Sequence, residues 1–219
     1  MRLRNIPGAN EHLANSPYVL HEPEKRRGRW REAAGADRPL HLEIGTGKGR
    51  FILQMAALHP DIFYIGIEKY SSVLLRAVQK QEETQLPNLV FIRYEAELLE
   101  NLFAPGEVDR IYLNFSDPWP KKSQAAKRLP SKEFLRLYDR VLSPDGTIEF
   151  KTDNRALFDF AVEEIGPGGY RPESITYDLH HDPVLCEGNV MTEYEERFSA
   201  MGNPICKYTI RRNRPLRER

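Results

Sequence analysis

Short apolar runs alternate with helix-like segments from residue 40 onward, and this alternation constrains the fold more than any other feature. The apolar runs predict strands at 40–44, 63–67, 89–92, 111–115 and 147–151. Helical patterns lie between these runs, at 51–58, 71–83, 132–142 and 155–165. Strands that alternate with helices are typical of βαβ units, which build a parallel sheet with helices on both faces. Because the crossovers are right-handed, we predict an α/β fold with a doubly wound sheet.

The rest of the chain extends this pattern. Further strands are expected at 174–179 and 205–211, with a short helix near 192–200. The tripeptide Pro144-Asp145-Gly146 is typical of a turn, and we expect it to separate the helix at 132–142 from the following strand. The prediction is therefore a mostly parallel, seven-stranded sheet.

Residues 1–37 differ from the remainder because their periodicity is weak and prolines and glycines interrupt it. We expect an N-terminal basic extension with short helical pieces over 1–37, followed by a single α/β domain over 38–219. The length of 219 residues suits one such domain.

Charge is distributed unevenly, although 32 basic and 32 acidic residues cancel. The zero net charge removes the simplest argument for nucleic-acid binding. Three stretches are nevertheless basic: residues 1–31 hold seven basic and three acidic side chains, residues 117–128 four and one, and residues 205–219 six and one. Since local potential steers a polyanion, these stretches are candidate contacts. The alternative is that the termini are solvated tails.

Cysteine usage and hydropathy exclude several classes of protein. Cys186 and Cys206 form no Cys-x-x-Cys pair and are too few for a disulfide scaffold. The start Met1-Arg2-Leu3-Arg4 lacks the apolar core of a signal peptide, and apolar stretches such as 51–58 are too short to span a bilayer. The pair His180-His181 and Cys186 lack the spacing of a zinc site. We expect a cytoplasmic protein without membrane contact or metal.

A glycine-rich loop follows the first predicted strand. Gly45, Gly47 and Gly49 alternate with other residues, which lets the backbone turn tightly and approach a ligand closely. The helix that follows offers unpaired N–H groups at its start. Glu43 ends the first strand and Glu68 ends the second, where a carboxylate can accept hydrogen bonds from a ribose diol. The alternative is a tight turn with Glu68 as a solvated strand end.

A second unusual loop follows the fourth predicted strand. Its sequence, from Asn114 to Lys122, is NFSDPWPKK. Two prolines and a tryptophan stiffen the loop around Asp117, so that it can present one carboxylate accurately to a substrate. The basic residues that follow suit phosphate groups. A carboxylate for a base and cations for a backbone suggest a nucleic-acid substrate, whereas the alternative is a structural turn followed by exposed charges.

These motifs together resemble those of one enzyme family. The E-x-G-x-G-x-G pattern looks like the cofactor site of class I S-adenosylmethionine-dependent methyltransferases, which have a Rossmann-like sheet. The resemblance narrows to bacterial tRNA (guanine-N7-)-methyltransferases through the segments NFSDPWPKK, EIGTGKG, YIGIE, FKTDN and MTEYEERF, and it covers nearly the whole chain. The family often has Asp where this chain has Glu95, which retains the carboxylate.

The resemblance implies a role for each matching position. Asp117 looks like the catalytic residue. The cofactor-binding residues it implies for S-adenosyl-L-methionine are Glu43, Gly45, Gly47, Glu68, Glu95, Ala96, Asn114 and Asp117. The implied substrate-binding residues are Lys121, Asp153, Thr192, Glu193, Tyr194 and Glu195, and the implied RNA contacts are Lys122, Ser123, Gln124, Lys127 and Arg128. The family's target is N7 of a guanine in the tRNA variable loop, which becomes 7-methylguanosine. The oligomeric state is left open between monomer and homodimer.

Two of these segments also have a purely local interpretation. Asp153 or Asn154 is a candidate N-cap for the helix at 155–165. Thr192 and Glu195 have the spacing of a helix start, with Thr192 as cap and Glu195 at the third helical position. The competing functions are a non-catalytic RNA-binding module, a nicotinamide oxidoreductase, and a methyltransferase for an exocyclic amine.

Overall fold

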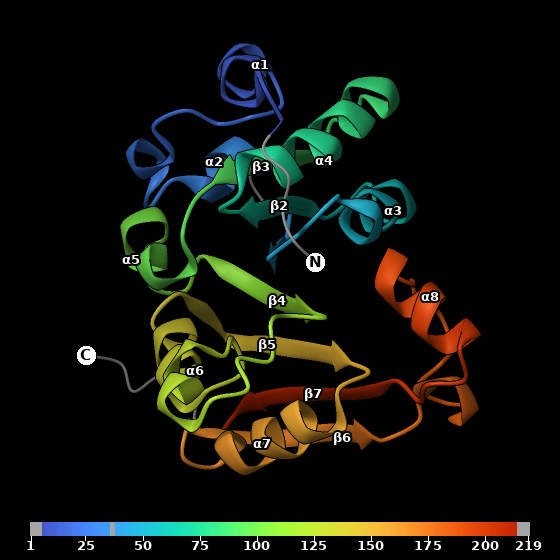
Figure 1. Ribbon diagram of the computed structural model, residues 1–219. Coiled ribbons are helices and arrows are strands. Elements are labelled where there is room, and N and C mark those ends of the chain that lie inside the picture. Colours follow the sequence, from blue (N-terminus) through green and yellow to red (C-terminus); the bar gives the residue numbers. More distant parts are fainter. Residues whose placement is uncertain (1–5, 36–37, 214–219) are drawn as a thin grey trace.

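The computed structural model describes residues 6–35 and 38–213. Within these residues the chain forms a seven-stranded sheet in the order β3-β2-β1-β4-β5-β7-β6 (Figure 1). Strands β1 to β5 run parallel, and β7 pairs antiparallel with both β5 and β6. The bounds are β1 Leu40–Ile44, β2 Phe63–Glu68, β3 Leu89–Arg93, β4 Val108–Asn114, β5 Leu142–Thr152, β6 Tyr170–Thr176 and β7 Cys206–Arg212. The predicted α/β class is confirmed.

Helices cover both faces of the sheet. On one face α3 (Arg50–Leu58) and α4 (Ser71–Thr84) pack with α1 (Ala9–Asn15) into one apolar cluster. On the other face α2 (Trp30–Ala34), α5 (Leu99–Leu102), α6 (Lys132–Asp139) and α7 (Arg155–Ile165) contribute to a second cluster. Strand β1 lies between the two layers with all five residues buried. This two-sided burial explains why the central strands are apolar runs.

The segment before β1 packs against the rest of the molecule. Val19 forms a parallel bridge with Phe91 of β3, whose backbone N–H donates to the Tyr18 carbonyl (2.8 Å). Trp30 is fully buried, and its indole N–H donates to the Leu102 carbonyl (2.7 Å). The segment thereby covers the exposed edge of β3, which would otherwise present unpaired backbone groups.

Short helical pieces occur in this segment, including the 3-10 helix η1 (Pro23–Arg26). The basic residues in 1–5 and 214–219 lie outside the described residues.

Two local predictions about the strands are wrong. Helix α6 ends at Asp139 and β5 begins at Leu142, so Pro144-Asp145-Gly146 belongs to the strand. Val108 pairs with Leu142 and Arg110 with Thr147, which leaves residues 143–146 opposite Asp109 alone. The tripeptide therefore forms a bulge, where proline is tolerated because it needs no ladder donor.

The second error concerns the edge strand β6. It spans Tyr170–Thr176 rather than 174–179, and its pairing with β7 is irregular between Pro172 and Ser174. After the buried Tyr170, the exposed residues Arg171-Pro172-Glu173 carry no apolar alternation that could have marked a strand.

The site-forming segments lie at the carboxyl ends of the parallel strands. They are the loops after β1 and β4, the 3-10 helices η2 (Ala96–Leu98), η3 (Lys122–Lys127) and η4 (Leu179–His181), and helix α8 (Glu193–Ala200). Figure 1 shows α8 beyond the arrowheads of β4 and β5. In an open parallel sheet this edge is where ligands bind. Among the described helices, none is long and apolar enough to cross a membrane.

Candidate active site

The loop between β1 and α3 has a backbone that requires glycine. Gly45, Gly47 and Gly49 have φ of 75°, 59° and 77°, in the left-handed region. A Cβ at Gly49 would lie 2.7 Å from the Cβ of Ala77 on α4, so this position also has no space for a side chain. The Gly45 N–H donates to the Ile67 carbonyl at the end of β2 (2.9 Å). The loop is thus fixed between the ends of two neighbouring strands.

Glu43 lies beneath this loop and is almost completely buried. Its carboxylate accepts hydrogen bonds from the Thr46 hydroxyl (2.5 Å) and from the Asn114 amide at the end of β4 (2.8 Å). Burial raises the pKa of Glu43 to about 7, although both hydrogen bonds act in the opposite direction. Two residues predicted from the sequence, Glu43 and Asn114, are therefore in direct contact.

Glu68 faces the same loop from the end of β2. Its carboxylate accepts hydrogen bonds from the backbone N–H groups of Gly47 (3.2 Å) and Tyr70 (3.0 Å). Burial raises its pKa despite these contacts. Each carboxylate oxygen retains acceptor capacity for a further donor. Glu95 is exposed after β3, the strand adjacent to β2, and Ala96 begins η2 beside it.

The loop after β4 holds Asp117 between two residues in unusual backbone conformations. Phe115 has φ 51° and Trp119 has φ 40°, a region that non-glycine residues rarely occupy. Asp117 is exposed. Such conformations cost on the order of 1–3 kcal/mol each and persist only where surrounding contacts impose them. The loop therefore depends on surrounding contacts to hold its backbone at these two positions, in addition to the constraint from its prolines.

Helix α8 carries the predicted Thr192–Glu195 segment, whose residues point in different directions. The Thr192 hydroxyl accepts from the Glu195 N–H (2.9 Å), which confirms the predicted cap. Tyr194 is 45% exposed, and its ring stacks on Phe115 at a centroid distance of 6.4 Å. The Glu193 carboxylate pairs with Lys48 of the glycine loop (3.1 Å) and Lys80 of α4 (2.8 Å). Helix α8 thus bridges the two loops.

Glu195 is fully buried beside Lys151 of β5. The Lys151 ammonium lies 2.6 Å from one carboxylate oxygen, while His180 (3.0 Å) and Asn189 (2.7 Å) contact the other. Lys151 also donates to the Val190 carbonyl (2.8 Å). Burial alone would raise the pKa of Glu195, but the charge of Lys151 holds it below its ordinary value. The side chain predicted as a substrate contact is therefore enclosed in this structure and anchors α8 to β5.

Asp153 and Asn154 divide the two roles that the sequence left open. The Asn154 side chain accepts from the Leu157 N–H (2.9 Å) and caps α7. Asp153 does not cap the helix; it receives a long hydrogen bond from the Asn203 amide (3.5 Å) and is partly exposed at the end of β5. Its carboxylate is accordingly available at the same sheet edge as Asp117.

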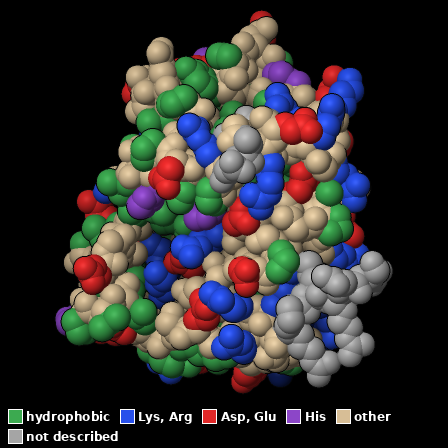
Figure 2. All heavy atoms as spheres, turned by 180° about the vertical axis from the view of Figure 1, so that it is seen from behind, with side chains coloured by type: hydrophobic (Ala, Val, Ile, Leu, Met, Phe, Trp, Pro, Cys, Tyr) green, Lys and Arg blue, Asp and Glu red, His purple; other side chains and the backbone are tan. Residues whose placement is uncertain are grey.

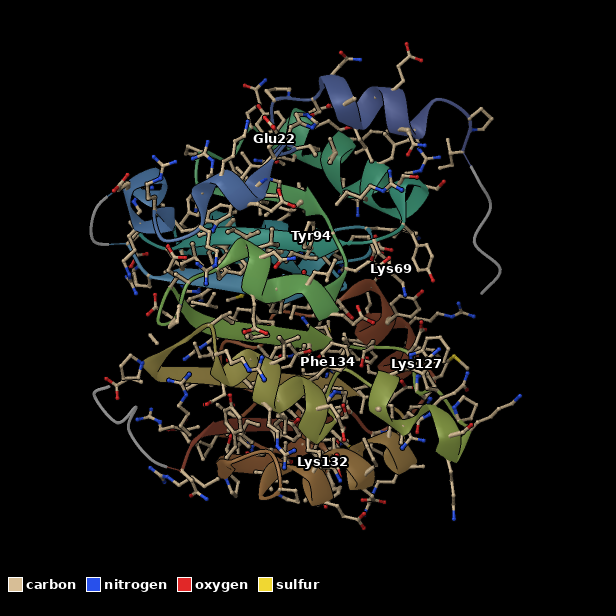
Figure 3. The ribbon with its side chains drawn as sticks, turned by 90° about the vertical axis from the view of Figure 1, so that its left-hand side faces the viewer. Glu22, Lys69, Tyr94, Lys127, Lys132 and Phe134 are labelled. Atoms are coloured by element: carbon tan, nitrogen blue, oxygen red, sulfur yellow. The ribbon has the colours of Figure 1, made fainter. Side chains whose placement is uncertain are left out.

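The basic segment after the Asp117 loop is mostly at the surface. Lys121, Lys122 and Ser123 are exposed, and Gln124 is partly exposed. The Lys127 ammonium lies 5.3 Å from the centre of the Trp119 ring. Figure 3 shows Lys127 on the same side of the molecule as Lys69, which directly follows Glu68. On the face seen in Figure 2, by contrast, Lys and Arg side chains are interspersed with Asp and Glu.

Comparison with known proteins identifies the family. Residues 37–208 match the model of a family described as "Putative methyltransferase". A tRNA (guanine-N(7)-)-methyltransferase of Lachnoclostridium phytofermentans is 58% identical over 205 residues, which cover 94% of this chain and 95% of that protein. Its counterpart from Geobacillus thermodenitrificans is 53% identical over 206 residues, or 94% of each chain. The chain belongs to the tRNA (guanine-N(7)-)-methyltransferase family.

Solved structures of more distant methyltransferases share the fold. An antibiotic-related methyltransferase superposes with a TM-score of 0.62 at 22% identity, covering 84% of this chain and 92% of its own. The 16S rRNA methyltransferase KamB gives the same TM-score at 15% identity, covering 83% and 91%. These likenesses establish the Rossmann-like methyltransferase architecture of the family member described here.

Sequence reasoning did not single out Lys151, Phe115 or Lys48, which all contact predicted site residues. Lys151 follows Phe150 in a central strand, where lysine is rare. Its position could have indicated a buried ion pair, because a buried ammonium requires partners. The described part of the chain contains no group of three or more His, Cys, Asp or Glu side chains arranged to hold a metal ion.

Proposed function

We propose that this protein transfers the methyl group of S-adenosyl-L-methionine to N7 of a guanine in the tRNA variable loop, giving 7-methylguanosine. The observation that carries the proposal is the meeting of three parts at one sheet edge: a glycine loop between two buried carboxylates, a constrained loop that presents Asp117, and helix α8 across both. The 58% identical relative is named a tRNA (guanine-N(7)-)-methyltransferase, which supports the proposed target atom.

The residues around the glycine loop suit S-adenosyl-L-methionine. The Glu68 carboxylate, which already accepts N–H groups from the glycine loop, would take the ribose hydroxyls. Gly45 and Gly47 have open space where a Cβ would lie, so a ligand can approach the backbone. Glu43 and Asn114 would support the methionine end, and Glu95 with Ala96 the adenine side. The bound cofactor supplies an electrophilic methyl group on a sulfonium.

Methylation of guanine N7 depends on positioning of the reactants more than on proton transfer. Guanine N7 has a free lone pair in the neutral base, so the nucleophile loses no proton. Methyl, sulfur and N7 must lie in line at near-attack distance. Asp117 would accept hydrogen bonds from the guanine N1–H and N2–H groups and stabilise the positive charge that arrives on the purine. Asp153, at the end of the neighbouring strand β5, is the second candidate for this task.

The RNA would lie across the exposed residues next to this edge. Lys121, Lys122 and Lys127 would contact phosphates, with Ser123 and Gln124 between them. Tyr194 offers an exposed aromatic face beside the Asp117 loop, which suits an unstacked base. Because tRNA is the proposed substrate, we infer that the protein acts in the cytoplasm.

The test is methylation of tRNA lacking 7-methylguanosine, with labelled cofactor and nucleoside analysis of the product. We expect the label in 7-methylguanosine of the variable loop. The variant Asp117→Asn retains shape but loses charge, and its single-turnover rate should fall by roughly two to three orders of magnitude. Label at another atom, or none, would refute the proposed function; an Asp117→Asn variant as fast as the parent would refute only the assignment of Asp117.

A further inference from the structure

Arg128, which directly follows the exposed Lys127, turns back onto the Asp117 loop. Its Nε donates to the carbonyl of Pro118 (3.0 Å), and its Nη2 donates to the carbonyl of Trp119 (3.0 Å). The guanidinium Cζ lies over the Phe160 ring of α7, 4.3 Å from its centre. Arg128 thus connects the carbonyls of the two residues that directly follow Asp117 to a helix packed on the sheet.

The loop needs such a contact because its backbone is constrained on both sides of Asp117. Phe115 and Trp119 have positive φ, which ordinary side chains disfavour. Pro118 and Pro120 have no N–H, so this stretch can form few backbone hydrogen bonds of its own. The guanidinium fork fixes two successive carbonyls at once, and a charged donor strengthens each contact. Helix α7 in turn holds Arg128 through the cation–π contact with Phe160.

We propose that Arg128 is a positioning residue that holds the Asp117 loop in its reactive conformation, and that it does not act mainly as an RNA contact. The proposal rests on the proposed function, because Asp117 is the group that it positions. A planar fork is required, since lysine is a single flexible point charge. Loss of the fork should therefore reduce the methyl-transfer step and leave the affinity for tRNA unchanged.

A measurement without either substrate tests the geometry. The chain has two tryptophans, and Trp30 is fully buried, so quenching by acrylamide reports on Trp119. We expect Arg128→Gln to increase the quenching constant, because Trp119 loses its carbonyl contact. Arg140→Gln is the matched control, since its exposed guanidinium pairs with Glu100 away from the loop. Equal quenching in the parent, Arg128→Gln and Arg140→Gln proteins would overturn the proposal.

The kinetic test separates positioning from RNA binding. At saturating tRNA and cofactor, Arg128→Gln should transfer methyl on the order of 10²-fold more slowly, as expected when a reacting group is misplaced by about 1 Å. Arg128→Lys should recover little of this loss, and Arg140→Gln should match the parent. The contrasting variant Lys122→Gln should instead weaken tRNA binding and flatten its salt slope by roughly 0.7–0.9.

The outcomes distinguish failure of the role proposed for Arg128 from failure of the proposed function. If Arg128→Gln keeps the saturated rate and behaves like Lys122→Gln in affinity and salt slope, Arg128 is an RNA contact and the inference fails. If the parent forms no 7-methylguanosine, the proposed function fails before any variant is compared. Urea unfolding of each variant shows whether the fold is retained. For a variant with reduced stability, acrylamide quenching is measured at urea concentrations below its unfolding transition, so that it reports on Trp119 in the folded protein.

Discussion

Replacement of Lys151 by methionine would leave the Glu195 carboxylate buried without its cation. The Lys151 side chain is 4% exposed, the Glu195 side chain is fully buried, and 2.6 Å separates the ammonium from the nearer carboxylate oxygen. Removal of one partner from such a pair costs about 3–5 kcal/mol, because the remaining charge stays desolvated. His180 and Asn189 still contact the carboxylate, so we expect the lower half of this range. Urea unfolding at pH 7, followed by intrinsic fluorescence, measures the change.

A control and a double variant make this prediction refutable. Lys80→Met removes a cation from a half-exposed pair with Glu193 and should cost less than about 1 kcal/mol. Glu195→Gln combined with Lys151→Met leaves no buried charge in the pair, so the double variant should be more stable than Lys151→Met alone. The reasoning is refuted if Lys151→Met costs no more than Lys80→Met, or if the two changes are additive.

Three further predictions concern the candidate site. The pKa of Glu43 is raised from 4.5 to about 7 in the folded protein, so its contribution to stability is complete below pH 4.5 and is lost as pH rises through 7. In urea unfolding, the parent should therefore lose about 3 kcal/mol of unfolding free energy between pH 4.5 and 7.5 relative to Glu43→Gln. Parallel pH profiles of the two proteins would contradict this. Glu68→Ala should weaken cofactor binding by on the order of 1.5–3 kcal/mol in calorimetry, whereas unchanged affinity would remove Glu68 from the site. Replacement of Lys121, Lys122 and Lys127 by glutamine should flatten the salt dependence of tRNA binding by roughly 0.7–0.9 per lost phosphate contact, and a parental slope would mean that these lysines are only solvated.

The central sheet was predictable because its strands are buried on both sides. Such strands appear as apolar runs, and the expected range 40–44 coincides with β1. The bulge at Pro144-Asp145-Gly146 was not predictable, because a turn signal also suits a bulge and only pairing with β4 distinguishes them. The start of β6 escaped for a related reason: an exposed edge strand needs no apolar alternation.

The candidate site was predictable where backbone chemistry dictates the residue. Alternating glycines and acidic residues at the ends of strands predict the loop near Glu43 and Glu68 in any sequence with this pattern. Side-chain direction is a tertiary property, and there sequence reasoning was incomplete. Glu195 was expected to contact the substrate and Arg128 the RNA, yet the structure turns Glu195 inward to Lys151 and Arg128 back onto the Trp119 carbonyl. The hydrogen-bond partners that decide these directions lie far away along the chain or in neighbouring loops.

The segment that covers the edge of β3 also has a consequence for how the chain folds as it is synthesised. Trp30 leaves the ribosome early, but the carbonyl that receives its indole N–H belongs to a residue 72 positions later, and the Glu107 carboxylate that binds its backbone N–H comes 77 positions later. Trp30 must therefore wait until residues 102–107 have been synthesised before these contacts can form, and it is exposed to chaperones in the meantime. A nascent chain stalled before Glu107 would be far more sensitive to proteases in this segment than one stalled after β5.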